Sequence, residues 1–173
     1  MNAKAQLLAD VRDGGCAALA QLRALPPSEF ATVRYDNGWT ARDILAHVAA
    51  IEAIYPLYIK LAELGVAGES PPEGIRRATA EEVPDAPTVF AAGGLDALNE
   101  RFVAARVDAT VDELIGEFEH NRAATIAAIE AADEALLRVP VRSAGGIYGT
   151  LAAVLHRIAV EHIEEHVRDI IGG

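Results

Sequence analysis

The sequence predicts an all-α protein, a bundle of four main helices plus short helical pieces, with a long loop after the second helix. Apolar residues recur every three or four positions in separate stretches, and no stretch alternates apolar and polar residues as a half-buried strand does. Alanine is abundant while aromatic residues make up only 5% of the chain, which favours closely packed helices over strands. At 173 residues the chain can bury a core, so we expect residues 1–173 to form a single domain.

The first two helices have clear boundary signals. The first is expected over about residues 3–25, where a pair of prolines ends it, since proline disrupts a helix interior. The second opens at Thr40, whose hydroxyl can cap the helix together with Asp43 three positions on, the spacing of a capping box. It should run to about Leu64, with Pro56 bending or dividing it.

The third helix follows a long loop. Residues 65–94 are rich in glycine, proline and glutamate, a composition typical of a loop, and a loop of this length could cover a pocket. The third helix is then expected over about residues 95–107, with Leu95, Leu98 and Phe102 on its apolar face.

The fourth helix and the last helix complete the bundle. The fourth starts at a second capping box, Thr110 with Glu113, and continues to about Ala132, after which come residues 133–149. Those residues include a glycine-rich run that we expect to be a loop. Thr150 then caps a last helix that reaches about Ile171.

Charge and cysteine content exclude several classes of partner and site. The formal net charge of −11 would repel nucleic-acid phosphates and anionic lipid heads, so we expect no nucleic-acid partner and no membrane partner. No uncharged apolar run reaches membrane-spanning length, and charged residues follow the N-terminus too soon for a signal peptide. Cys16 is the only cysteine, which excludes an intrachain disulfide and a cysteine-based zinc cluster, and we expect a cytoplasmic protein.

Three of the five histidines are predicted to face the interior. An α-helix turns about 100° per residue, so each histidine can be placed relative to the apolar stripe of its own helix. His47 falls within the stripe of the second helix. The stripe of the last helix begins at Leu151 and, continued at the same period, reaches His162 and His166, which we therefore expect at core positions.

The other two histidines do not share this direction. His120 lies opposite the apolar stripe of the fourth helix and should face solvent. His156 lies about 120° from His162 around the last helix, so we expect it to pack or to support the site rather than to be a ligand. The remaining candidates for the wall of a pocket are Tyr55, Tyr58 and Tyr148.

The inward-facing set has two interpretations, a polar core and a metal site. A single inward imidazole usually satisfies both ring nitrogens through a carbonyl or a carboxylate, and it is more often structural. Three are harder to satisfy, and the i, i+4 spacing of His162 and His166 suits one ion. The residues alone leave both interpretations open, and the metal interpretation assigns His47, His162 and His166 as ligands of one divalent ion.

Acidic residues beside these histidines raise two further roles. The run from His162 to His166 matches the H-x-x-E-H pattern of inverted zinc proteases, but those enzymes take a third ligand from a later segment, and only seven residues follow here. We therefore expect Glu165 to be a solvated carboxylate on the helix surface. Asp169 returns to the stripe, where it either accepts a hydrogen bond from a ligand histidine or belongs to a hydrated terminal turn.

The residues around the histidines resemble the DinB/YfiT-like superfamily of bacterial four-helix-bundle proteins. The similarity rests on the run Gly38-Trp39-Thr40-Ala41-Arg42-Asp43 leading to His47, and on Gly149-Thr150-Leu151 followed by His162 and His166. It implies a four-helix bundle whose metal site takes one histidine from the second helix and two from the last. These positions are His47, His162 and His166, while Asp169 stands where many relatives have glutamine.

The resemblance also implies a class of activity. Family members with assigned activities include thiol-dependent S-transferases that use bacillithiol or mycothiol, a maleylpyruvate isomerase, and proteins that detoxify reactive electrophiles. We therefore expect a metal-dependent transferase or hydrolase acting on a small electrophilic molecule, with a low-molecular-weight thiol as a candidate cofactor. Imidazole suits several ions, and we expect Zn²⁺ or Ni²⁺, with Fe²⁺ or Mn²⁺ as alternatives. The competing hypothesis is a non-catalytic bundle that binds a small molecule or forms a homodimer.

Overall fold

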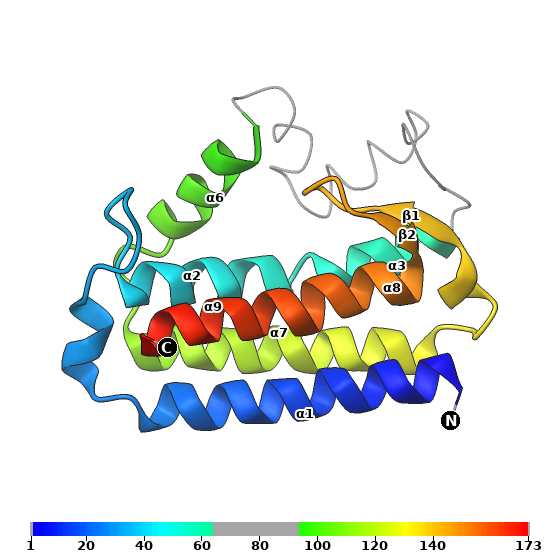
Figure 1. Cartoon of the computed structure of the whole chain (residues 1–173), viewed down its shortest axis with the longest axis horizontal. Coiled ribbons are helices and arrows are strands. Elements are labelled where there is room, and N and C mark those ends of the chain that lie inside the picture. The colour runs from blue at the N-terminus through cyan, green and yellow to red at the C-terminus, as the bar shows by residue number, and fades with distance from the viewer. Residues whose placement is uncertain (1, 64–93, 173) are drawn as a thin grey trace.

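The computed structural model describes residues 2–63 and 94–172, and in these ranges the protein is a helical bundle with one short hairpin (Figure 1). The all-α fold predicted from the sequence is confirmed. In chain order the elements are α1 (Ala3–Ala24), η1 (Pro27–Ala31), α2 (Ala41–Glu52), α3 (Tyr55–Glu63), α6 (Gly94–Ala104), α7 (Val111–Ala131), η2 (Leu136–Arg138), β1 (Pro140–Arg142), β2 (Tyr148–Thr150), α8 (Leu151–His156), η3 (Arg157–Glu161) and α9 (His162–Ile171).

Four helical stretches form the bundle: α1, α2 with α3, α7, and the continuous run of α8, η3 and α9 (Figure 1). Both α1 and α2 pack against α7 and against α9, so the four stretches enclose one core. Apolar side chains from all four are removed from solvent there, including Leu22, Leu45, Phe118 and Ile163. Burial of this apolar surface is the main force that holds the helices together.

The predicted capping boxes both form. At the start of α2 the Thr40 hydroxyl accepts from the backbone N–H of Asp43 at 3.2 Å, and the Asp43 carboxylate accepts from the Thr40 N–H at 3.0 Å. Thr110 and Glu113 repeat the arrangement at the start of α7. These paired bonds satisfy N–H groups that have no partner inside the helix, and they fix where each helix begins.

Two predicted boundaries need adjustment. The second helix divides, as anticipated from Pro56, into α2 and α3, with the break at residues 53–54. The third helix, α6, ends at Ala104 rather than near residue 107, because the chain turns there. The loop predicted for residues 65–94 lies outside the described residues except at Gly94, where α6 begins.

A short antiparallel hairpin stands where the sequence predicts only a loop. Strand β1 pairs with β2 in the register Pro140 to Thr150, Val141 to Gly149 and Arg142 to Tyr148. Each strand has three residues, too few for the alternation of apolar and polar side chains that identifies a strand in a sequence. The hairpin leads directly into α8, whose first turn Thr150 caps as predicted.

A π turn, η3, interrupts the last helical stretch. A π turn closes with i→i+5 hydrogen bonds instead of i→i+4, so it holds one more residue and offsets everything after it. The buried row that begins at Leu151 and Leu155 therefore continues through Ala159, Ile163 and Val167. An uninterrupted α-helix would have placed His162 and His166 in this row. Their predicted core position is therefore wrong, because the buried row is shifted by one residue. Both histidines lie beside the core instead.

The segment Ala41–Glu63 is long and apolar enough to cross a membrane by length and composition alone. Two thirds of its most apolar window, 67%, is buried against the other helices. This is the burial expected of a helix inside a bundle.

Candidate metal centre

The first histidine of the candidate centre, His47, is almost completely buried. It lies in α2, is 4% exposed, and is flanked by Ile44 and Val48, which are fully buried. Its ring packs at 5.6 Å from the indole of Trp39, which stands just before the helix. Gly38, with a φ of +90°, makes the turn that places Trp39 there, a conformation that favours glycine.

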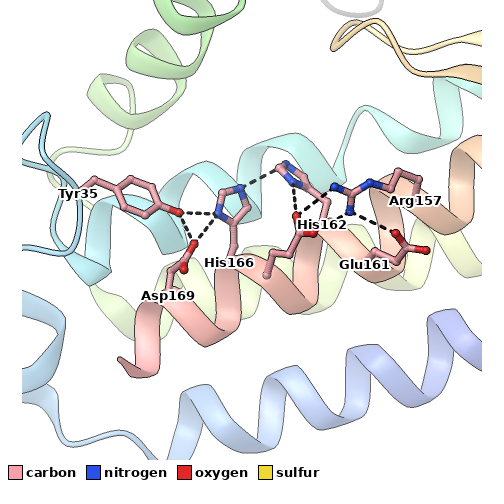
Figure 2. Close-up of polar contacts among 7 residues, drawn as sticks. Tyr35, Arg157, Glu161, His162, His166 and Asp169 are labelled. Atoms are coloured by element: carbon pink, nitrogen blue, oxygen red, sulfur yellow. Dashed lines mark hydrogen bonds and ion pairs between the residues drawn. The ribbon is translucent and has the colours of Figure 1, made fainter. Parts of the chain in front are cut away.

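The other two histidines stand one turn apart at the start of α9 (Figure 2). Their side chains are partly open to solvent, 36% for His162 and 12% for His166. The π turn rotates them out of the core row so that they face α2 across a cavity. The predicted pairing of His162 with His166 is thus present, although on a different face from the one predicted.

The three imidazoles converge. The ring of His166 lies 5.0 Å from the ring of His47 and 4.3 Å from the ring of His162, and the Nε2 atoms of His162 and His166 are 3.2 Å apart. One ring nitrogen from each of the three residues lies within 4.8 Å of the other two. The structure therefore brings together the three histidines that the sequence singled out.

Burial keeps these imidazoles neutral. Desolvation, followed by the neighbouring imidazoles, lowers the pKa of His47 to about 3, and the same two effects lower the pKa of His166 to about 4. Burial also lowers the pKa of His162, against the attraction of Glu165. A neutral imidazole has a free lone pair on one nitrogen, which is the form that binds a metal ion.

The donor set fits one divalent ion. A tetrahedral ion with Zn–N bonds of about 2.0–2.1 Å would place two ligand nitrogens about 3.3 Å apart, close to the separation of the two Nε2 atoms. Nδ1 of His47 is buried and has no hydrogen-bond partner among the residues that the structure describes. A buried polar atom without a partner is destabilising, and an ion shared by the three imidazoles would give this nitrogen a partner.

Tyr35 provides the hydrogen bond that orients His166 (Figure 2). Its hydroxyl lies 3.0 Å from Nδ1 of His166 and donates a short hydrogen bond to the carboxylate of Asp169. Since the hydroxyl donates to Asp169, it can accept from Nδ1–H of His166, and this tautomer leaves the Nε2 lone pair facing the other histidines. The sequence raised a supporting role for Asp169, whose carboxylate lies 3.7 Å from Nδ1 of His166 and also reaches it through the Tyr35 hydroxyl.

A second series of polar contacts runs from His162 through Glu165 to Arg157 (Figure 2). Nδ1 of His162 lies 3.8 Å from Oε2 of Glu165, and Arg157 donates to both carboxylate oxygens of Glu165 at 3.0 and 3.3 Å. The guanidinium lowers the pKa of Glu165, so this carboxylate stays ionised at neutral pH. The solvated surface position expected for Glu165 is therefore only part of its role, because its charge is shared between Arg157 and the His162 ring.

The three histidines line the wall of a cavity of about 470 Å³. This is the size of a pocket for a small organic molecule. Most of the wall is apolar or aromatic, with polar groups from Asn37, Asn99 and Ser143, and with Asp96 and Glu100 from α6. The Nε1–H of Trp39 donates to Glu100 at 2.9 Å and so connects α6 to the loop beside His47.

Of the remaining candidates from the sequence, some line the cavity and others do not. Tyr55 and Tyr58 line it, whereas Tyr148 is 65% exposed and lies elsewhere. His120 is exposed, as predicted. His156 lies 3.5 Å from Asp10 and 3.2 Å from Glu161. It is not among the described residues that line the cavity.

The comparison with known proteins agrees with this fold. A family model described as the DinB superfamily matches residues 16–170, a span that holds all three histidines. A mycothiol-dependent maleylpyruvate isomerase shares the fold at 19% identity with a TM-score of 0.69, and a mutant of that enzyme with one histidine replaced by alanine does so at 18% and 0.70. Each structure covers 96% of this chain, which spans 60% of the isomerase. No curated protein matches the sequence.

Proposed function

The chain belongs to the DinB superfamily, and from this membership and the convergent histidines we propose that it is a metal-dependent enzyme acting on a small molecule. His47, His162 and His166 would hold one divalent ion, with Zn²⁺ or Ni²⁺ as the first candidates. The reaction we propose is the transfer of a low-molecular-weight thiol to a small electrophile, or the hydrolysis of such a molecule.

One observation carries this proposal: the three imidazoles meet on the wall of a cavity rather than in a closed core. A purely structural metal site is normally closed by four protein ligands, whereas a catalytic site has three and keeps a position open to substrate. Three histidines and an adjoining cavity are the arrangement of the second kind. When bound, such an ion lowers the pKa of a thiol or a water molecule at the site, so that a nucleophile is present at neutral pH.

The side chains around the cavity supply binding, orientation and exclusion of water. Ile51, Ile54 and Phe102 offer an apolar surface for the body of a small molecule. Tyr35 holds the ring of His166, and burial keeps His47 neutral and ready to bind. Trp39 covers one side of His47, which limits the access of bulk water to that nitrogen donor.

A thiol is the nucleophile that we propose first. The isomerase that shares the fold is described as mycothiol-dependent, and the cavity is large enough to take part of a thiol together with a small electrophile. Cys16 is exposed on α1 and does not line the cavity, so the thiol would come from a separate molecule. The single domain, the cytoplasmic location and a homodimer all stay predictions.

The test is a screen of low-molecular-weight thiols and water against a panel of small electrophiles, using the untagged full chain. We expect turnover that a chelator abolishes and that Zn²⁺ or Ni²⁺ restores. His47→Ala should abolish it as well, while His120→Ala, the matched change at an exposed histidine, should leave it intact. Metal binding without turnover across the whole panel would contradict the enzymatic proposal and favour a non-catalytic binding protein.

A further inference from the structure

A buried ion pair crosses the bundle beside the candidate centre. Glu52 of α2 has no exposed surface, and the side chain of Arg122 of α7 is 4% exposed. Nη2 of Arg122 lies 3.0 Å from Oε2 of Glu52. Neither residue lines the cavity, and the proposed function gives neither of them a role.

Stability alone does not explain this pair. Removing two charges from water is costly, and apolar residues of similar volume often replace a buried ion pair with no loss of stability. The contact is also imperfect, because in the described residues both carboxylate oxygens of Glu52, Nε of Arg122 and the hydroxyl of Tyr55 lack an aligned hydrogen-bond partner. A pair of this kind is better explained by what it holds in place.

Arg122 connects three elements. Its Nη1 donates to the backbone carbonyl of Ala159 at 2.6 Å, inside the π turn, while Nη2 faces Glu52 of α2. Thr125, one turn further along α7, donates to the backbone carbonyl of Glu52 at 3.4 Å. The guanidinium therefore joins α2, which carries His47, to the π turn that immediately precedes His162.

A glycine in α1 makes room for this connection. A Cβ atom placed on Gly15 would lie 3.2 Å from Cγ and 3.3 Å from Cδ of Arg122, closer than nine in ten real contacts of this kind. Glycine in the middle of a helix is destabilising relative to alanine, and α1 is a helix of 22 residues. The presence of glycine at position 15 is explained by packing, because the Arg122 side chain passes close to α1 at this position.

We propose that Glu52 and Arg122 are positioning residues for the three-histidine cluster. They anchor the π turn to α2 and α7, and so set where His162 and His166 stand relative to His47. The expected effect on metal affinity rests on the proposed function. The anchoring of the π turn does not, because it can be measured without a metal.

The test compares the full chain with the double variant Glu52→Leu/Arg122→Met, using Co²⁺ as a spectroscopic probe and backbone hydrogen exchange as a readout that needs no metal. The variant should stay folded, since apolar residues of similar size replace the pair. Its affinity for Co²⁺ should fall by about 10-fold or more with a changed visible spectrum, the effect typical of losing support around metal ligands. Amides of residues 157–163 should exchange about 10-fold faster than in the native protein.

A matched control uses the exposed ion pair between Arg23 and Glu119, which joins α1 to α7 away from the cavity. Arg23→Gln/Glu119→Gln should change neither Co²⁺ binding nor exchange in the π turn. Should the double variant unfold, Arg122→Lys retains the charge but not the forked donor, and it should lower Co²⁺ affinity in the same direction.

The outcomes separate the two proposals. Native affinity and an unchanged Co²⁺ spectrum in the double variant, or in Arg122→Lys where that variant replaces it, would overturn the positioning role. If the native protein itself binds no Co²⁺, the proposed metal-dependent function fails, and the positioning role is then decided by exchange. Equal exchange rates in the π turn of the native and variant proteins would overturn it.

Discussion

Replacing Tyr35 with phenylalanine removes one oxygen atom and leaves the aromatic ring in place. That oxygen lies 3.0 Å from Nδ1 of His166 and donates to Asp169. A hydrogen bond to a charged group contributes about 1.5–3 kcal/mol, which corresponds to about 10- to 100-fold in an equilibrium constant. The same range is found when an orienting partner of a metal-ligating histidine is removed. We therefore expect Tyr35→Phe to bind Zn²⁺ about 10- to 100-fold more weakly than the native protein.

The assay is a competition titration with a chromophoric chelator, combined with ¹⁵N spectra of the histidine side chains. The titration gives the affinity, and the spectra show whether the proton of His166 leaves Nδ1 when the phenol is lost. Tyr148→Phe is the matched control, because Tyr148 is 65% exposed and lies outside the cavity wall. Equal Zn²⁺ affinities for Tyr35→Phe, Tyr148→Phe and the native protein would refute the proposed orientation of His166.

Three further changes test the fold and its buried charge. Burial raises the pKa of Glu52 to about 7 against the opposing effect of Arg122, so folding favours the protonated carboxyl. The native protein should therefore lose stability relative to Glu52→Gln as the pH rises from about 4.5 to 7, by up to about 3 kcal/mol in urea unfolding, and a constant difference would contradict this. Thr40→Ala removes the cap of α2 and should lower the free energy of unfolding by about 1 kcal/mol in the same assay, where no loss would show the cap to be dispensable. Ile163→Ala should cost about 2–5 kcal/mol because the π turn places Ile163 in the core at 2% exposure, whereas a cost below about 1 kcal/mol would speak against the π turn.

The sequence was sufficient for the helices and for the choice of histidines. Proline and the two capping boxes act locally, so the positions of α1, α2 and α7 could be predicted without knowledge of the packing. His47 was placed correctly from the apolar stripe of its helix, because α2 is regular over its whole length. The same test selected His162 and His166 but assumed a straight helix.

The π turn shows where that assumption fails. Ile163, Val167 and Ile170 form an apolar row that is one position out of step with the row at Leu151 and Leu155. The two rows fit one continuous helix only if a turn between them holds one extra residue. This offset is visible in the sequence and could have indicated the π turn. It matters for the site, since the offset exposes the two histidines to the cavity instead of enclosing them.

Two parts of the site could not be found from periodicity. Tyr35 lies in the loop before α2, where no helical period indicates the direction of a side chain, and it reaches His166 and Asp169 from 131 and 134 residues away. Arg122 and Glu52 are charged residues within helices, and charged residues are almost never fully buried unless paired. Their pairing depends on how α2, α7 and η3 pack against one another, which is information that a single helix does not contain.

The metal content of the native protein tests the central claim most directly. The full chain, purified without an affinity tag, should carry or take up one divalent ion per molecule when measured by elemental analysis and by titration with Zn²⁺. His47→Ala, His162→Ala and His166→Ala should each lose that ion, while His120→Ala should retain it. A native protein that binds no stoichiometric ion, or a His47→Ala variant that binds Zn²⁺ as tightly as the native protein, would contradict the three-histidine centre.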